Sequence, residues 1–394
     1  MSLSLSSQTA CANPDPYVNI EWIRQFGTSD ADRAYGMAVN GSDTIYVAGI
    51  TGSTLPGQTS SGGNDAFVRK YDGTGNEIWT RQFGSSTDDY AMGVAVDGSD
   101  NVYITGITWG ALPEQENLGG TDAFVRKYDG AGNEVWTKQF GTSANDRASG
   151  VVVDGSDNVY VMGYTYGALP GQSSSGDRDA FIRKYDGEGN EIWTKQFGTF
   201  AYDDVRDVAI DGLSNIYVSG LTLGALPGEE NLGNYDAFIR KYDDGGNEVW
   251  TRQFGTSEED YGYGVAVDGS DNVYVAGDTL GALPGQTPSG GRDAFVRKYD
   301  GEGNEVWTKQ FGTSENDRAL DVAGDGSDNI YVMGYTLGTF PGQTSSGGWD
   351  AFVREYDGAG NDVWTKQFGS SADDHAWSVA GDGLGNVYVL SLIH

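Results

Sequence analysis

The stretch Glu-Val-Trp-Thr-Lys-Gln-Phe-Gly, residues 134–141, occurs along the chain in seven near-identical copies. Its tryptophan returns after every 57 residues, at Trp22, Trp79, Trp136, Trp193, Trp250, Trp307 and Trp364. Seven copies without an insertion or a deletion indicate one supersecondary unit that is stacked seven times. The shared residues, which we call frame residues, therefore build a common scaffold. We expect function to lie where the copies differ.

Each unit contains four short runs of strand-like sequence. In the unit from Asp65 to Thr121 these runs are residues 66–71, 77–83, 94–96 and 102–105, and Gly, Asp and Asn turns separate them. No stretch has the helical period, so the units predict an all-β protein. Seven four-stranded antiparallel units of 57 residues predict a seven-bladed β-propeller. A β-solenoid is the main alternative, but its rungs are usually shorter.

The repeat resembles a known family in two of its segments. These are Val-Ala-Val-Asp-Gly-Ser-Asp-Asn-Val-Tyr-Val at residues 265–275 and Asp-Ala-Phe-Val-Arg-Lys-Tyr-Asp at residues 293–300. Both are similar to the bacterial SBBP-type β-propeller repeat, and the resemblance runs from about residue 18 onward. It implies a propeller fold and an extracellular or cell-surface setting in bacteria. A fainter similarity to quinoprotein-type propellers gives little support for a quinone cofactor, because those repeats are slightly longer.

The two ends of the chain do not fit the repeat equally well. We expect residues 1–17 to form a poorly ordered leader and residues 18–394 to form one propeller domain. The Asp-Ala-Phe strand occurs six times and the Trp strand seven times. We therefore expect the last blade to be incomplete and closed by the N-terminal strand at residues 18–26, with residues 6–12 as a poorly fitting candidate for its missing strand. An alternative is that the chain is a fragment, because residues 390–394 leave the repeat.

Composition excludes several classes of partner. The formal net charge of −33 disfavours binding to nucleic acid and to anionic membrane surfaces. The single cysteine, Cys11, rules out an internal disulfide, and no apolar run reaches the length of about 18 residues that a membrane span needs. We expect no nucleic-acid binding, no membrane insertion, and a chain that is monomeric or part of a larger protein.

Successive loops of a propeller alternate between its two ends, and one end carries nearly all of the variation between copies. We call this end the variable face. Its variable positions hold Arg, Tyr and Trp, the residue types that concentrate binding energy. An alternative is drift, in which some of these side chains merely fill gaps between blades. The predicted ligand-binding residues are Arg33, Tyr35, Tyr90, Trp109, Arg147, Arg178, Arg206, Tyr235, Tyr261, Tyr263, Arg292, Arg318, Trp349, His375 and Trp377.

One aspartate recurs in every unit at the start of the presumed innermost strand. Such a carboxylate most often caps the backbone amides of the preceding loop. The alternative is a calcium site that it shares with the Asp65-type aspartate and loop carbonyls. We predict no other cofactor. The aspartates are Asp32, Asp89, Asp146, Asp203, Asp260, Asp317 and Asp374.

Catalysis has little support in the sequence. The two histidines are His375 and His394, and there is no Cys–His or Ser–His pairing. The nearest candidates for acid–base chemistry are carboxylates, but we find no pair that a break in the repeat singles out. We predict an extracellular or cell-surface module that binds a glycan or a protein. The alternatives are a non-binding spacer of a larger surface protein and a glycan-active hydrolase or lyase. The carboxylate candidates are Asp204, Asp207, Asp278 and Asp321.

Overall fold

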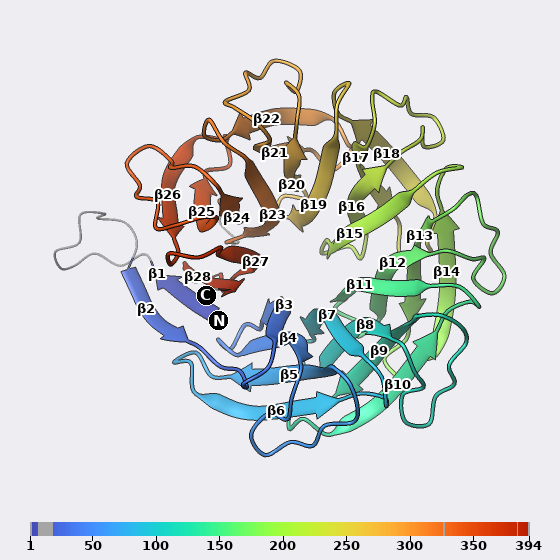
Figure 1. The fold of residues 1–394 in the computed structure, drawn as a ribbon. Helices are drawn as coiled ribbons and strands as arrows, with labels where there is room; N and C mark the ends of the chain where they lie inside the picture. Colours follow the sequence, from blue (N-terminus) through green and yellow to red (C-terminus); the bar gives the residue numbers. More distant parts are fainter. Residues whose placement is uncertain (1, 7–18, 326–327, 384, 393–394) are drawn as a thin grey trace.

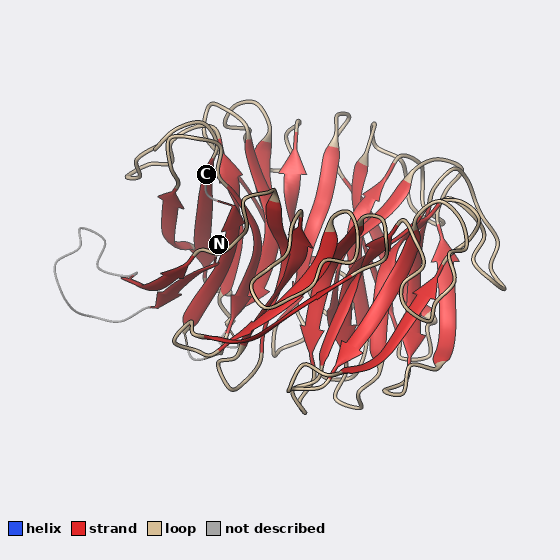
Figure 2. Ribbon diagram, turned by 60° about the horizontal axis from the view of Figure 1, so that its bottom comes forward, coloured by secondary structure: helices blue, strands red, loops and turns tan. Residues whose placement is uncertain are grey.

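The computed structural model describes residues 2–6, 19–325, 328–383 and 385–392. In this part of the chain, strands and loops make up the whole structure (Figure 2). The strands form four-stranded antiparallel sheets that stand around a central opening (Figure 1). The chain is thus an all-β propeller. Within the described ranges, no helix has the length and apolar character that a membrane crossing requires.

Six blades are each built from four consecutive strands, ordered from the central opening outward. Blade 1 contains β3 (Asp32–Val39), β4 (Ile45–Thr51), β5 (Asp65–Tyr71) and β6 (Glu77–Phe83). Blade 2 contains β7 (Asp89–Val96), β8 (Val102–Thr108), β9 (Asp122–Tyr128) and β10 (Glu134–Phe140). Blade 3 contains β11 (Asp146–Val153), β12 (Val159–Thr165), β13 (Asp179–Tyr185) and β14 (Glu191–Phe197).

The remaining three continuous blades repeat this order. Blade 4 contains β15 (Asp203–Ile210), β16 (Ile216–Thr222), β17 (Asp236–Tyr242) and β18 (Glu248–Phe254). Blade 5 contains β19 (Asp260–Val267), β20 (Val273–Thr279), β21 (Asp293–Tyr299) and β22 (Glu305–Phe311). Blade 6 contains β23 (Asp317–Gly324), β24 (Ile330–Thr336), β25 (Asp350–Tyr356) and β26 (Asp362–Phe368).

Both ends of the chain meet in one further sheet, which we call the composite sheet. Its order is β27 (His375–Gly381), β28 (Asn386–Leu392), β1 (Ser2–Ser6) and β2 (Asn19–Arg24). Strand β1 pairs antiparallel with β28, and β27 packs between β23 and β3 (Figure 1). The composite sheet therefore closes the ring and leaves no unpaired edge between the two chain ends.

The expectation of a seven-bladed propeller with seven equivalent units is wrong. Six blades, not seven, are continuous, and the first Trp strand lies in the composite sheet. The expected unit from Asp65 to Thr121 is also split between blades 1 and 2. The reason is that Thr51 pairs with Asp65, so the long loop between β4 and β5 belongs to a hairpin inside one blade. The short loop at residues 84–88 is the one that crosses between blades.

Strand β1 occupies the position for which residues 6–12 were the expected candidate. Residues 7–18 lie outside the described part, as does His394. The predicted leader, residues 1–17, thus contributes one strand to the composite sheet.

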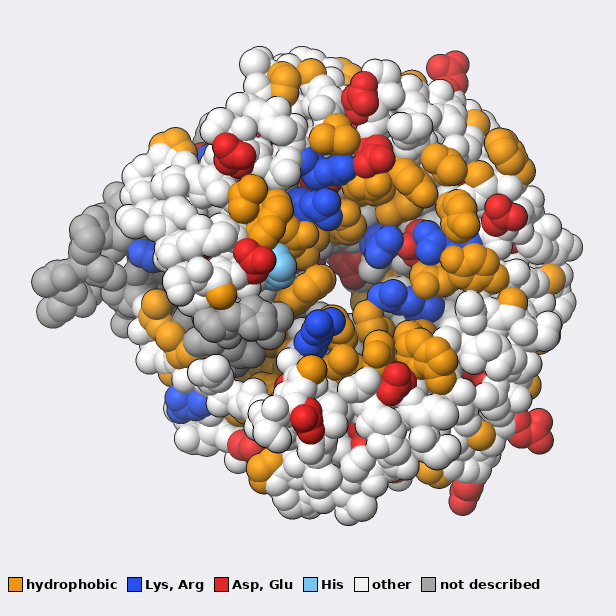
Figure 3. Space-filling view, viewed as in Figure 1, with side chains coloured by type: hydrophobic (Ala, Val, Ile, Leu, Met, Phe, Trp, Pro, Cys, Tyr) orange, Lys and Arg blue, Asp and Glu red, His pale blue; other side chains and the backbone are white. Residues whose placement is uncertain are grey.

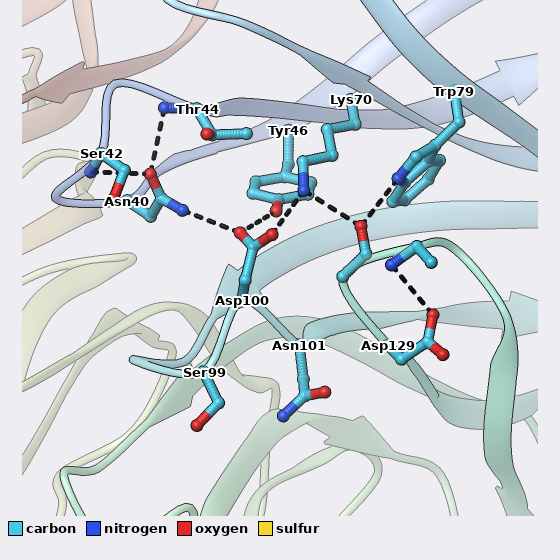
Figure 4. A network of polar contacts seen from close by, with 12 residues as sticks. Asn40, Ser42, Thr44, Tyr46, Lys70, Trp79, Ser99, Asp100, Asn101 and Asp129 are labelled. Atoms are coloured by element: carbon cyan, nitrogen blue, oxygen red, sulfur yellow. Dashed lines mark hydrogen bonds and ion pairs between the residues drawn. The ribbon is translucent and has the colours of Figure 1, made fainter.

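Frame residues tie each blade to the next one. In blade 1, the Lys70 Nζ atom lies 2.5 Å from Asp100 Oδ2 and donates to the Gly130 carbonyl at 3.0 Å, and both acceptors lie in turns of blade 2 (Figure 4). The Trp79 Nε1 atom donates to the same carbonyl at 3.1 Å, and the Tyr46 hydroxyl donates to Asp100. The tryptophan contact recurs from the composite sheet to blade 1 and between each later pair of neighbouring blades up to blade 6. The repeated residues therefore serve packing and cohesion.

One position of the composite sheet departs from the frame in a way that predicts a stabilising substitution. A Cβ atom at the equivalent glycines would lie 1.8–2.0 Å from a backbone carbonyl oxygen of the neighbouring strand. Ser391 takes this place in β28, is buried, and has a hydroxyl without a hydrogen-bond partner. We expect Ser391→Gly to raise the free energy of unfolding by about 1 kcal/mol, because the buried hydroxyl costs more than the added chain entropy of glycine. A lower midpoint of urea unfolding in this variant would contradict the account. The glycines are Gly49, Gly106, Gly163, Gly220, Gly277 and Gly334.

Candidate functional site at the mouth of the central channel

Every innermost strand carries a β-bulge at the same place in the repeat. In blade 1, Ala34 pairs with Gly49 and Gly36 pairs with Ala48, so Tyr35 is the extra residue. A bulge bends the strand and re-aims the side chain of that residue. The register skips one residue in the same way in the other five blades and in the composite sheet. The seven bulge residues are Tyr35, Met92, Ser149, Arg206, Tyr263, Leu320 and Trp377.

All seven bulge residues line one cavity of about 520 Å³ at the central opening, which we call the mouth cavity. Figure 3 shows cationic and hydrophobic side chains gathered around the hollow at the centre of this face. Tyr90, Arg147 and the two carboxylates Asp207 and Asp321 also line the cavity. The fold therefore brings the most variable position of the repeat to one place.

Aromatic rings form one side of the mouth. The Trp377 ring lies 6.1 Å from the rings of both Tyr35 and His375, and the His375 ring lies 4.4 Å from the Tyr335 ring. Trp349 packs edge-on against Tyr335 at 5.0 Å. Of the cavity-lining aromatic residues, Trp377 is 37% exposed and offers a free ring face to a ligand.

Arginines dominate the opposite side, on blades 3 and 4. Asp204 is buried and lies 2.8 Å from Arg206 Nη2 and 3.3 Å from Arg178 Nη2. Arg147 reaches the cavity from β11 and stands over the ring of Tyr164. This group places two guanidinium groups beside one carboxylate and a third over the ring of Tyr164.

A more evenly balanced cluster lies between blades 5 and 6. Arg292 pairs with the buried Asp278 and, at 2.7 Å, with Glu259, and Arg318 lies 3.7 Å from Asp278. Burial raises the pKa of Asp278 to about 6, although both arginines act in the opposite direction. Arg292 also stands over the ring of Tyr261, 5.0 Å from its centroid. The two arginines here are thus already engaged by acidic side chains.

Asp207 and Asp321 form a carboxylate pair on the cavity wall. Asp207 Oδ2 accepts a hydrogen bond from the Val265 amide at 2.8 Å, and Asp321 Oδ2 accepts one from the Val379 amide at 2.9 Å. Each carboxylate thus ties its own innermost strand to that of the next sheet. Burial and then the negative charge of Asp321 raise the pKa of Asp207, and burial raises the pKa of Asp321.

One position of the repeat identifies this pair in the sequence, because it carries aspartate in two copies and glycine or serine in the others. In the other copies, the position of Asp207 and Asp321 is held by Gly36, Gly93, Gly150, Gly264 and Ser378. The inference that no carboxylate pair breaks the repeat was therefore wrong. An alignment of the seven copies at this position would have found the pair.

The fifteen predicted binding residues occupy distinct places on this face. Six line the mouth cavity: Tyr35, Tyr90, Arg147, Arg206, Tyr263 and Trp377. Eight others contact these six or their neighbours: Trp109, Arg178, Tyr235, Tyr261, Arg292, Arg318, Trp349 and His375. Arg33 is exposed at the start of β3 and forms no ion pair or ring contact with the described residues. Their role in binding stays a prediction.

A further variable position had no part in the predicted site. It is the middle residue of the Gly-x-Thr segment that ends the second strand of each blade, and it supplies Tyr164, Asp278 and Tyr335 to the clusters above. Asp278 was considered only as a catalytic candidate. Comparison of the copies at this position would have added Tyr164 and Tyr335 to the predicted binding residues.

The repeated aspartates make the loop contacts expected of capping residues. In each case Oδ2 accepts a hydrogen bond of 2.5–2.6 Å from the amide four residues earlier. Burial raises the pKa of five of them, Asp89, Asp146, Asp203, Asp260 and Asp317. Over the described residues, no three His, Cys, Asp or Glu side chains are arranged to hold a metal ion. The calcium role of these aspartates stays a prediction.

Sequence comparison identifies the repeat. The family model of the SBBP beta-propeller repeat matches residues 78–113, 135–170, 192–227, 249–284 and 306–341. The regulatory protein FlaEY of Caulobacter vibrioides is 27% identical over 299 residues, which cover 66% of this chain and 31% of that protein. An uncharacterized WD repeat-containing protein of Acanthamoeba polyphaga mimivirus is 23% identical over 94% of this chain and 36% of its own length. The chain thus spans about a third of these curated relatives.

Comparison with solved structures supports the fold. The WD40 domain of Neurospora crassa Pan2 aligns with a TM-score of 0.54 at 10% sequence identity, over 91% of this chain and 88% of that domain. At this identity the likeness concerns the propeller architecture alone.

Proposed function

We propose that the chain is a binding module and that it holds a glycan in the mouth cavity. The observation that carries this proposal is the convergence of seven different bulge residues on one cavity. Frame positions stay nearly constant from copy to copy, whereas this position varies among Tyr, Met, Ser, Arg, Leu and Trp. If the fold were only a scaffold, nothing would favour large side chains of different types at this one position around the opening.

The chemistry of the cavity suits a sugar. Sugar hydroxyls both donate and accept hydrogen bonds. The cavity offers the guanidinium donors of Arg147 and Arg206 beside the hydroxyls of Ser149 and Tyr35, which can donate and accept. Trp377 and Tyr35 offer flat apolar surfaces for the C–H face of a sugar ring. The cavity volume of about 520 Å³ falls within the range of about 300–1,000 Å³ that is typical of small-ligand sites.

The two alternative functions are less well supported. A spacer would bury its loop aromatics, whereas Trp109 and Trp377 are 39% and 37% exposed. A hydrolase needs carboxylates that are available to the substrate, whereas Asp207 and Asp321 are held by backbone amides. An extracellular or cell-surface setting remains a prediction from the resemblance of the repeat.

We expect Trp377→Ala to weaken glycan binding about tenfold or more, because a central exposed aromatic residue that stacks on the ligand carries a large share of the affinity. The measurement is a glycan-array screen of the wild type, followed by titration calorimetry with the best binder. Phe200→Ala is the control, since Phe200 is an exposed aromatic residue (81%) that does not line the cavity. Equal affinities of the wild type and a folded Trp377→Ala variant would refute the proposed site. Binding to a protein partner but to no glycan would retain the site and change the ligand class.

A further inference from the structure

The arginines of the mouth cavity differ from those of the frame in their partners. Each Asp-Ala-Phe strand carries an arginine that faces an acidic residue of the neighbouring Trp strand, as Arg69 faces Glu77 at 3.4 Å. The same pairing recurs in blades 2 to 6. Acidic residues outnumber basic ones by 57 to 24 in this chain. Arginines without a carboxylate partner are the minority among the described residues, and three of them, Arg24, Arg81 and Arg252, donate to backbone carbonyls of the next blade instead.

Arg147 also belongs to this minority, and it points into the mouth cavity. It forms no ion pair with the residues that the structure describes, and its Nε atom is buried without a hydrogen-bond acceptor. Its close neighbours Arg178 and Arg206 share the single carboxylate of Asp204, and the Arg178 Nε atom also lacks an acceptor. The corner formed by blades 3 and 4 thus has more guanidinium groups than carboxylates to pair with them.

The acidic groups of the cavity do not supply the acceptors that the Nε atoms of Arg147 and Arg178 lack. Asp207 and Asp321 are bound to backbone amides of the next innermost strands. Asp278 is engaged by Arg292 and by Arg318 of blade 6, and Glu259 is engaged by Arg292. A buried guanidinium N–H without an acceptor costs free energy, and a planar carboxylate is the acceptor that matches it best.

We propose that the mouth cavity selects sugars that carry a carboxylate, that is, hexuronates and related acidic sugars. This inference rests on the proposed function and names the ligand class of the same site. The carboxylate would be held by Arg147 and Arg206, and the ring would face Trp377 and Tyr35 across the cavity. Selectivity arises because a neutral sugar leaves the Arg147 guanidinium without a charged acceptor.

The net charge of the chain sets a further condition on the ligand. At −33 the protein repels polyanions over distances of about a Debye length, which is roughly 8 Å at physiological ionic strength. The protein repels only one negative charge on a terminal acidic sugar, whereas it repels many on a long polyuronate. We therefore expect single acidic sugars to bind better, per sugar, than long polymers at low salt.

The test compares sugars that differ in one group. Methyl glycosides of glucuronate, galacturonate and mannuronate are titrated against those of glucose, galactose and mannose, with the wild type, Arg147→Gln and Lys309→Gln. Lys309 lies on the outer strand β22, so its substitution makes the same change in net charge far from the cavity. We expect at least one uronate to bind the wild type and Lys309→Gln about tenfold more tightly than its neutral parent. In Arg147→Gln the two sugars should bind equally.

The outcomes separate this inference from the proposed function. Wild-type binding of neutral sugars at least as tight as that of every uronate would overturn the acidic-sugar assignment and leave glycan binding intact. A uronate preference that survives in Arg147→Gln would overturn the role of Arg147. No binding of either class by a chain with native circular dichroism would contradict both proposals. Arg147→Lys should restore part of the preference, because it returns the charge without the planar fork.

Discussion

Trp79→Ala is expected to lower the free energy of unfolding by about 3–5 kcal/mol. Trp79 is 9% exposed, and its ring lies 6.2 Å from Tyr46 of its own blade and 6.4 Å from Tyr128 of blade 2. Its Nε1 atom donates a hydrogen bond to the Gly130 carbonyl of blade 2. The substitution would therefore open a cavity between two blades and remove one of the two hydrogen bonds that the Gly130 carbonyl accepts, Lys70 supplying the other. Urea unfolding followed by circular dichroism measures the loss.

Trp377→Ala is the matched comparison, because it removes the same side chain from the mouth cavity. Trp377 is 37% exposed and its ring lies 6.1 Å from the rings of Tyr35 and His375, so we expect a loss below about 1 kcal/mol. Equal losses in the two variants would contradict the division between frame residues and binding residues.

Asp207→Asn is expected to change how the stability depends on pH. An acid whose pKa is higher in the folded chain stabilises the fold fully below its unfolded pKa, near 4, and this contribution is lost as the pH rises through the folded pKa. Burial and the charge of Asp321 raise the pKa of Asp207 in this way. Wild-type stability should therefore fall between pH 5 and pH 8. The variant keeps an oxygen for the Val265 amide but cannot ionise, so we expect it to lose about 2 kcal/mol less over this interval.

Asp30→Asn controls for the general effect of removing one negative charge, since Asp30 is an exposed loop residue. The free energies of unfolding of the three chains are measured at pH 5 and pH 8. If the free energy of unfolding changes by the same amount between pH 5 and pH 8 in Asp207→Asn and in the wild type, ionisation of Asp207 does not destabilise the fold. That result would contradict the account of the cavity wall.

The sequence predicts where the four strands of each unit lie, because the repeat shows each of them several times. Two of the predicted runs are too short, since 94–96 is part of β7 (Asp89–Val96) and 102–105 is part of β8 (Val102–Thr108). The Trp strand at residues 77–83 was predicted with the bounds that β6 has in the structure. Blade boundaries were harder to predict, because three loops of each unit join antiparallel neighbours and one crosses between sheets. The longest loop, at residues 52–64, looks like a connection between blades. In the structure it belongs to a hairpin and is held by Leu55, which is buried.

The candidate site was predicted in its residue types and its face, but not in its geometry. Variation at the position of Tyr35 and Trp377 is visible in the sequence, whereas the β-bulge that turns this residue into the channel is not. The bulge is a feature of the pairing between the first and second strands, which no single strand reveals. The carboxylate pair was missed because Asp207 and Asp321 are two copies apart and were not compared at one repeat position.

A crystal structure of the chain with its best-binding sugar tests the central claim most directly. The account predicts that the sugar lies in the mouth cavity, with its ring against Trp377 and a polar group within hydrogen-bond distance of Arg147. A sugar bound instead at the opposite end, among the nearly invariant turns that contain Asn40 and Asp100, would contradict the assignment of binding to the variable face.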